Sequence, residues 1–174
     1  MAQALAASSV LSVVDEVVEV EKRTVTEVMD SLALLMGDAS GDGFAQSGVT
    51  PLSHVSSDWD VWIQEEIATL KSLGKNWDGY GAEAPIGALV NCVEGFLRSV
   101  GSQAVMPPKP EVTPSNDGGV MLEWETAKGD FFLEILPKDE INVHVETADM
   151  EFEGSLTECL EDAKKAWAHL LIDS

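Results

Sequence analysis

Positively charged residues are scarce in this sequence. It has 10 Lys and Arg against 31 Asp and Glu among 174 residues, which gives a formal net charge of −21 at pH 7. A chain this acidic repels phosphate backbones, so direct binding of DNA or RNA is not expected. The charge favours a basic protein partner, or serves solubility. The region 111–174 contains 16 acidic and 4 basic residues, so it carries more than half of the net charge.

The sequence also lacks a long uninterrupted apolar run. Its start, MAQALAASSVLSVVDEVVEV, has no basic residue before the apolar stretch, and Asp15 interrupts that stretch. A secretory signal peptide requires the basic start, and a membrane span requires about 20 mostly apolar residues. Neither is predicted, and we expect a cytoplasmic protein with no membrane partner.

Residue types that build catalytic and metal sites are few. Cys92 and Cys159 form no CxxC pair, so reduced thiols are expected, although a single disulfide remains possible. His54 and His169 have no Ser or Cys partner in a nucleophile motif. The glycines lack the spacing of a phosphate-binding loop. We therefore predict no catalytic residue, no cofactor and no metal site.

Residues 1–36 are predicted to contain one long helix that begins near Ser9. Apolar residues recur at alternating steps of three and four, with Glu21 interrupting the series; they are Val14, Val18, Val25, Val28, Leu32 and Leu35. Residues 37–56 have the composition of a flexible linker. A helix separated in this way is typical of oligomerisation or docking, so Val25, Val28, Leu32 and Leu35 are predicted to contact a partner or a second copy. Folding back onto the domain is the alternative.

Residues 57–174 are predicted to form an α+β core domain. A helix begins at Ser57 and ends at Gly74 as its C′ residue, and a second helix has Pro85 as its N1 residue and ends near Gly101. The period then changes from 3.6 to 2, which predicts an antiparallel meander of four or five strands. A last helix is expected from about Ser155 to Ile172. Helices before and after one antiparallel sheet indicate the α+β class.

The strand pattern also predicts which side chains face the core. The inward residues are expected to be Val120, Leu122, Trp124, Phe131, Leu133, Ile135, Ile141, Val143 and Val145.

The stretch NWDGYGAEAP between the two helices is predicted to be a structural corner, made of Asn76, Trp77, Asp78, Gly79, Tyr80 and Gly81. Asn76 and Asp78 can cap backbone amides, and the glycines permit positive φ. The aromatic rings of Trp77 and Tyr80 are expected to anchor the corner to the core. The alternative makes Asp78 a catalytic acid or base assisted by Tyr80.

The same corner carries a resemblance. The matching segments are Leu73, Asn76 to Ala82, Pro85, Pro110 to Pro114, Asp117 to Trp124 and Phe131 to Leu136. These elements, NWDGYGA followed by DGGV and LEW, resemble those of a widespread group of small uncharacterised bacterial and phage-borne proteins. The resemblance spans roughly 59–147 and implies a bacterial or mobile-element setting. It supplies no catalytic residues.

The outward positions of the predicted strands are rich in acid. They include Glu123, Glu125, Glu134, Glu146, Glu151 and Glu153, with His144 among them. Like charges on adjacent strands cost stability unless water or a partner relieves them. Three interpretations remain open: a solvated face, a docking face for a basic protein, and a metal site built on His144, Glu134 and Glu146.

Together these patterns favour a non-enzymatic, acidic protein-interaction module. Its most concrete form is an inhibitor or antitoxin-like regulator that covers a basic, nucleic-acid-binding surface of a defence or toxin protein. The alternative is a small metal-dependent hydrolase that uses Asp78 or the acidic face.

Overall fold

The computed structural model describes residues 30–35, 57–103, 107–138 and 140–172. Its first two named helices are α2 (Ser57–Ser72) and α3 (Gly87–Gly101). The strands that follow are β1 (Glu111–Pro114), β2 (Val120–Thr126), β3 (Gly129–Ile135), β4 (Ile141–Thr147) and β5 (Glu151–Ser155). The chain then forms α4 (Leu156–Trp167) and a turn of π-helix (Ala168–Ile172). The predicted α+β class is confirmed.

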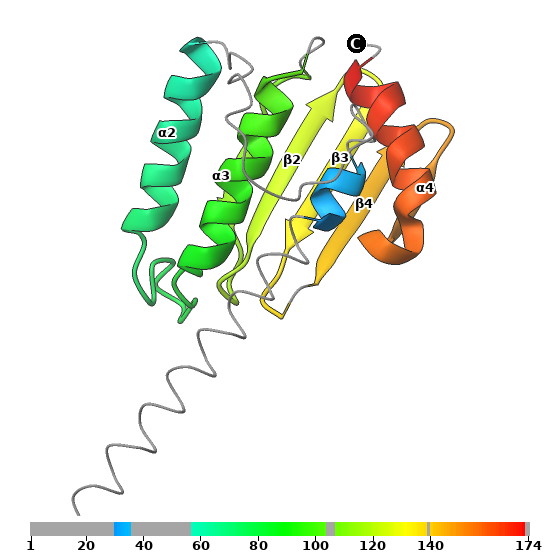
Figure 1. Ribbon diagram of the computed structural model, residues 1–174. Helices are drawn as coiled ribbons and strands as arrows, with labels where there is room; N and C mark the ends of the chain where they lie inside the picture. Colours follow the sequence, from blue (N-terminus) through cyan, green and yellow to red (C-terminus); the bar gives the residue numbers. More distant parts are fainter. Residues whose placement is uncertain (1–29, 36–56, 104–106, 139, 173–174) are drawn as a thin grey trace, which may run out of the picture.

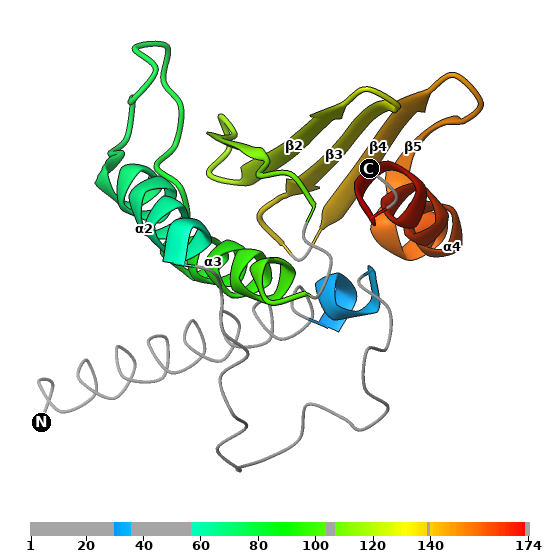
Figure 2. The same cartoon turned by 90° about the horizontal axis from the view of Figure 1, so that it is seen from above.

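The sheet is an antiparallel meander with the spatial order β1-β2-β3-β4-β5. All helices of the described chain lie on one side of it, with α3 and α4 directly over the strands and α2 beside α3 (Figures 1 and 2). The period-2 pattern accounts for this layering, because one face of each strand is apolar and needs a cover. The nine side chains predicted to face the core are all buried there.

Four aromatic residues fill the centre of the core between the sheet and the helices: Phe96, Trp124, Phe131 and Trp167. The Trp124 ring makes edge contacts with Phe131 and Trp167, with centroid distances of 5.9 and 5.1 Å. The indole nitrogen of Trp124 donates a hydrogen bond of 2.9 Å to the carbonyl of Pro108. Edge-to-face geometry is the favoured arrangement of such rings, so this cluster fixes α3 and α4 against the strands.

Two helix boundaries differ from the sequence prediction. The N-cap of α3 is Ile86, so Pro85 precedes the cap instead of occupying N1. Helix α2 ends at Ser72, and Gly74 is not among the glycines with positive φ, so it is no left-handed C′ residue. The α4 start does follow capping chemistry, since the Ser155 hydroxyl accepts from the Glu158 amide.

Residues 30–35 are helical and lie between α3 and α4, on the helical side of the sheet (Figures 1 and 2). Leu32 and Leu35 are each 1% exposed and belong to the same buried cluster as the sheet core, whereas Leu34 is 54% exposed. These two leucines fill apolar space between the helices. The predicted division at residue 36 therefore cuts through the core packing. Residues 1–29 and 36–56, with the rest of the predicted helix and the linker, lie outside the described residues.

None of the helices in these described segments is long and apolar enough to cross a membrane.

Candidate functional site

The side of the sheet opposite the helices presents a second set of side chains. Strand alternation and the pairing register place 14 residues of the five strands on this outward face. They are Glu111, Thr113, Met121, Glu123, Glu125, Asp130, Phe132, Glu134, Asn142, His144, Glu146, Glu151, Glu153 and Ser155. Eight of these are carboxylates and none is Lys or Arg. We call this surface the acidic face.

One row of the acidic face consists only of carboxylates. Glu125 pairs with Asp130, Asp130 with Glu146, and Glu146 with Glu151, so four acids lie side by side across β2 to β5. Directly opposite side chains have Cβ atoms about 4.5–5.5 Å apart. Like charges at this spacing repel each other, so the row destabilises the free protein. A bound cationic partner would reduce this repulsion.

The middle row mixes acid with aromatic side chains. It runs from Glu111 through Glu123, Phe132 and His144 to Glu153. Burial raises the pKa of the Glu123 carboxyl, and the charges of Glu111, Asp130 and Glu125 raise that pKa further. The acids of this face are therefore close enough to perturb one another.

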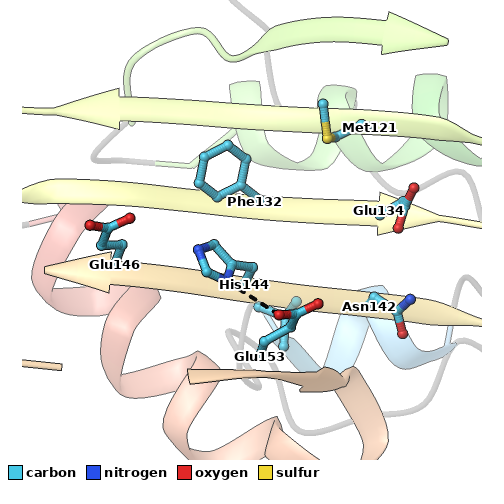
Figure 3. A pocket seen from close by; sticks show the side chains of 8 residues that line it. Met121, Phe132, Glu134, Asn142, His144, Glu146 and Glu153 are labelled. Atoms are coloured by element: carbon cyan, nitrogen blue, oxygen red, sulfur yellow. Dashed lines mark ion pairs between the residues drawn. The ribbon is translucent and has the colours of Figure 1, made fainter. Parts of the chain in front are cut away.

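A shallow depression of about 290 Å³ lies in the middle of the acidic face (Figure 3). The rings of Phe132 on β3 and His144 on β4 lie next to each other there, with centroids 5.3 Å apart. The Nδ1 atom of His144 is 4.0 Å from a carboxylate oxygen of Glu153. The lining residues are Met121, Phe132, Glu134, Asn142, Val143, His144, Glu146 and Glu153.

Basic side chains are concentrated on the helices and loops. Arg98 on α3 pairs with Asp60 of α2 and with Glu94, and Lys71 of α2 lies 3.4 Å from Glu94. Lys109 pairs with Asp58 at 2.6 Å. On α4, Lys164 and Lys165 pair with Glu161 and Asp162. Five acids of the helical layer thus have a cationic neighbour, whereas the outward positions of the strands contain no Lys or Arg.

The corner after α2 is a tightly hydrogen-bonded loop. Asn76 adopts φ of 64°, and its side-chain oxygen accepts from the Gly81 amide at 2.8 Å. The Oδ1 atom of Asp78 accepts from the amides of Tyr80 and Ala82. Gly79 and Gly81 have positive φ, as predicted from their lack of a Cβ. Side-chain capping therefore organises the corner.

The segment that follows the corner contacts the second motif of the resemblance. The amides of Glu83 and Ile86 each donate a 2.9 Å hydrogen bond to the turn between β1 and β2, at Asn116 and Gly118. Gly118 has φ of 94°, and a Cβ there would lie 3.0 Å from the Ala84 carbonyl oxygen. The residues directly after NWDGYGA thus pack against the turn that contains DGGV.

One part of the predicted corner is wrong. Tyr80 is 96% exposed, so its ring does not anchor the loop to the core. The reason is local, because Gly79 and Gly81 turn the chain outward at the tip and leave only the Tyr80 amide engaged. Trp77 is half-buried, and its indole nitrogen donates to the Glu83 carbonyl at 3.1 Å, so it closes the loop on itself.

The alternative chemistry at Asp78 has little support in this geometry. Hydrogen bonds from the Tyr80 and Ala82 amides lower the pKa of the Asp78 carboxyl below its ordinary value of 3.8. A carboxyl group works best as a general acid or base near neutral pH when its pKa is raised toward that pH, and the shift of Asp78 has the opposite direction. The bonded oxygen serves as a loop cap instead.

The residues of the hypothetical metal site do not converge. Glu134 lies opposite Asn142, and Glu146 lies opposite Asp130, so these carboxylates flank His144 at strand spacing. Within the described segments, no three His, Cys, Asp or Glu side chains are placed to hold a metal ion. Cys92 and Cys159 are not joined in a disulfide, and burial raises the pKa of the Cys92 thiol.

The remaining predicted contact residues divide into three groups. The six glutamates assigned to the sheet, from Glu123 to Glu153, all lie on the acidic face. Leu32 and Leu35 are buried in the core, so neither is presented to a partner. Val25 and Val28 lie outside the described residues. The sequence reasoning did not name Glu111, Asp130, Phe132 or Met121, although strict alternation from Phe131 already places Phe132 on the outward side.

Comparison of this chain with protein-family models, with curated proteins and with solved structures finds no match. The geometry of the acidic face is therefore the basis for assigning a function.

Proposed function

We propose that this protein acts without catalysis, by binding a basic partner protein through the acidic face. The observation that carries this proposal is the composition of the 14 outward strand positions, which hold eight carboxylates and no Lys or Arg. A surface of one sign attracts a partner of the opposite sign and accelerates its association. Relief of the repulsion within the carboxylate row adds to the free energy of binding.

In the most specific form of this proposal, the protein is an inhibitor or antitoxin-like regulator in a bacterial, phage or mobile-element setting. The partner's basic surface would ordinarily bind nucleic acid, and the acidic face would cover it. An extended array of carboxylates on paired strands offers regularly spaced negative charge, as a nucleic-acid backbone does. The protein competes with nucleic acid for the same cationic groups.

The test uses charge reversal on the acidic face. The variant Glu123→Lys, Glu125→Lys, Glu134→Lys changes three carboxylates at outward positions, where substitutions are well tolerated. The matched control is Glu65→Lys, Glu158→Lys, Glu161→Lys, which makes the same change in net charge on α2 and α4. A partner captured from a bacterial lysate by the wild-type protein is the binding probe.

Association rates are measured for the three proteins between low and high ionic strength. We expect the wild-type rate to fall steeply as salt rises past about 0.15 M, where the screening length is about 8 Å. The face variant should associate much more slowly, while the helix variant stays near wild type. A partner that keeps its nucleic-acid affinity when complexed contradicts the inhibitory role. A salt-independent rate contradicts binding through the acidic face.

A further inference from the structure

The acidic face contains one feature that a uniform negative surface does not need. Phe132 and Met121 are apolar residues on the outward side of the sheet, and each is only partly buried. Together with His144 they form a less polar patch that extends from the middle row of the face to the row of Met121 and Asn142. On a face that serves only as a charged coat, these positions would be expected to carry acid or small polar residues as well.

The depression is of a size that suits one side chain better than a separate small molecule. Ligand pockets for drug-sized molecules occupy about 300–1,000 Å³ and enclose most of the ligand. This depression, at about 290 Å³, lies just below that range and is open along the sheet surface (Figure 3). A single protruding side chain from a docked protein matches it.

The lining specifies the chemistry of that side chain. The Phe132 ring offers a face for a cation, and the neighbouring His144 ring is tilted by 53° to it. Carboxylates surround the rings: Glu123 lies directly opposite Phe132 on β2, and Glu134 follows Phe132 on the same strand and face. Glu153 lies on the far side of His144. A cationic group that is flat and has several hydrogen-bond donors can stack on the Phe132 ring and donate to the glutamates around it.

The guanidinium group of arginine has this combination. It is planar, stacks on aromatic rings and offers five N–H donors that match carboxylates, whereas the lysine ammonium is compact and strongly hydrated. We propose that the depression around Phe132 and His144 receives an arginine side chain of the basic partner, with its guanidinium over the Phe132 ring and its donors directed to the surrounding glutamates. This inference rests on the proposed function, because it identifies the anchor within the same interface.

The test compares two blocked peptides of equal charge, tetra-arginine and tetra-lysine. Their affinities for the full chain are measured by NMR titration at low salt, following the ring signals of Phe132 and His144. A cation on an exposed aromatic ring gains about two- to fivefold in affinity, and the planar, weakly hydrated guanidinium gains more of this than the ammonium, so the arginine peptide should bind more tightly by up to this factor. The ring signals should move strongly with arginine and weakly with lysine.

Substitutions then locate the preference. Phe132→Leu keeps an apolar side chain but removes the aromatic face, so the preference for the arginine peptide should become smaller. Phe132→Trp should retain or increase the preference, because tryptophan is the best ring for cations. Tyr80→Leu is the matched control, since it removes an exposed aromatic ring outside the depression. It should leave the preference unchanged.

The outcomes separate the two proposals. Equal affinities of the wild-type protein for both peptides, or a preference that is unchanged in Phe132→Leu, overturns the arginine anchor and leaves charge-driven binding intact. A preference abolished by Tyr80→Leu also overturns it and assigns the arginine to the corner. Failure of both peptides to bind at low salt overturns the proposed function itself.

Discussion

Replacing Glu123 by Gln should stabilise the folded protein. Burial raises the pKa of Glu123, and the charges of Glu111 directly opposite, of Asp130 and of Glu125 raise it further. A directly opposed pair of like charges costs about 0.2–1 kcal/mol. Removing the Glu123 charge should therefore raise the free energy of unfolding by about 0.5–1 kcal/mol at pH 7. For a domain of this size that corresponds to roughly 2–5 °C in melting temperature.

The pH dependence of this gain has a defined sign. The pKa of Glu123 is raised in the folded protein, so folding favours the protonated carboxyl and disfavours the charged one. The stabilising contribution of the protonated form is fully present below the ordinary pKa of 4.5 and is lost as the pH rises through the folded-state pKa. The advantage of Gln over Glu should therefore be largest at neutral pH and absent below pH 4.5.

Thermal and urea unfolding at two salt concentrations would measure the effect. The control is Glu161→Gln on α4, which removes a carboxylate 3.2 Å from the Lys164 amine and should cost a few tenths of a kcal/mol. High salt should shrink both changes. A loss of stability in Glu123→Gln, or a gain that is insensitive to pH and salt, would refute the account of repulsion on this face.

Two other pairs of substitutions separate buried or capping residues from exposed neighbours. Asp78→Ala should lower the melting temperature above pH 4, because the carboxylate caps two amides. The pKa of Asp78 is lowered in the folded protein, so this stabilising contribution is lost in acid. Tyr80→Ala should leave the melting temperature unchanged. Equal losses in both would show that the tyrosine ring packs after all. Leu32→Ala should cost about 2–5 kcal/mol in urea unfolding, against less than about 0.5 kcal/mol for Leu34→Ala. Indistinguishable results would exclude residues 30–35 from the core.

The sheet could be predicted closely from the sequence because its signal is redundant. Each strand places apolar residues at every second position, and a shift by one residue would turn all of them to the outward side. Val120, Leu133 and Val145 are each 0% exposed, in agreement with that pattern. The same alternation placed the six named glutamates outward.

The register between strands could not be predicted from the sequence. Which outward side chains lie next to one another across the strands was therefore not predicted either. Alternation shows that Asp130 faces outward, but only the pairing places it between Glu125 and Glu146. The contact between Phe132 and His144 depends on register in the same way. Pairing is set by turn geometry and by contacts distant in sequence, and a single strand pattern contains neither.

Local turn chemistry was only partly predictable. The capping roles of Asn76 and Asp78 follow from side chains that reach nearby amides, and both were predicted. The direction in which the Tyr80 ring points depends on the whole loop, and the expected anchoring was wrong. Burial of Leu32 and Leu35 in the core was only the alternative prediction, because a linker-like composition does not indicate where the preceding helix packs.

The carboxylate row also bears on how this protein avoids associating with itself. Strand β5 ends the sheet, and an exposed sheet edge is a template for pairing with another chain. If a second copy paired with β5 strand to strand, the carboxylates of Glu151 and Glu153 would lie close to the same carboxylates of that copy and repel them. The charge that would attract a basic partner thus protects the edge. That protection depends on ionised carboxylates, so it should weaken as the pH approaches the isoelectric point near 4.1. At that pH we expect the protein to aggregate by strand-to-strand pairing.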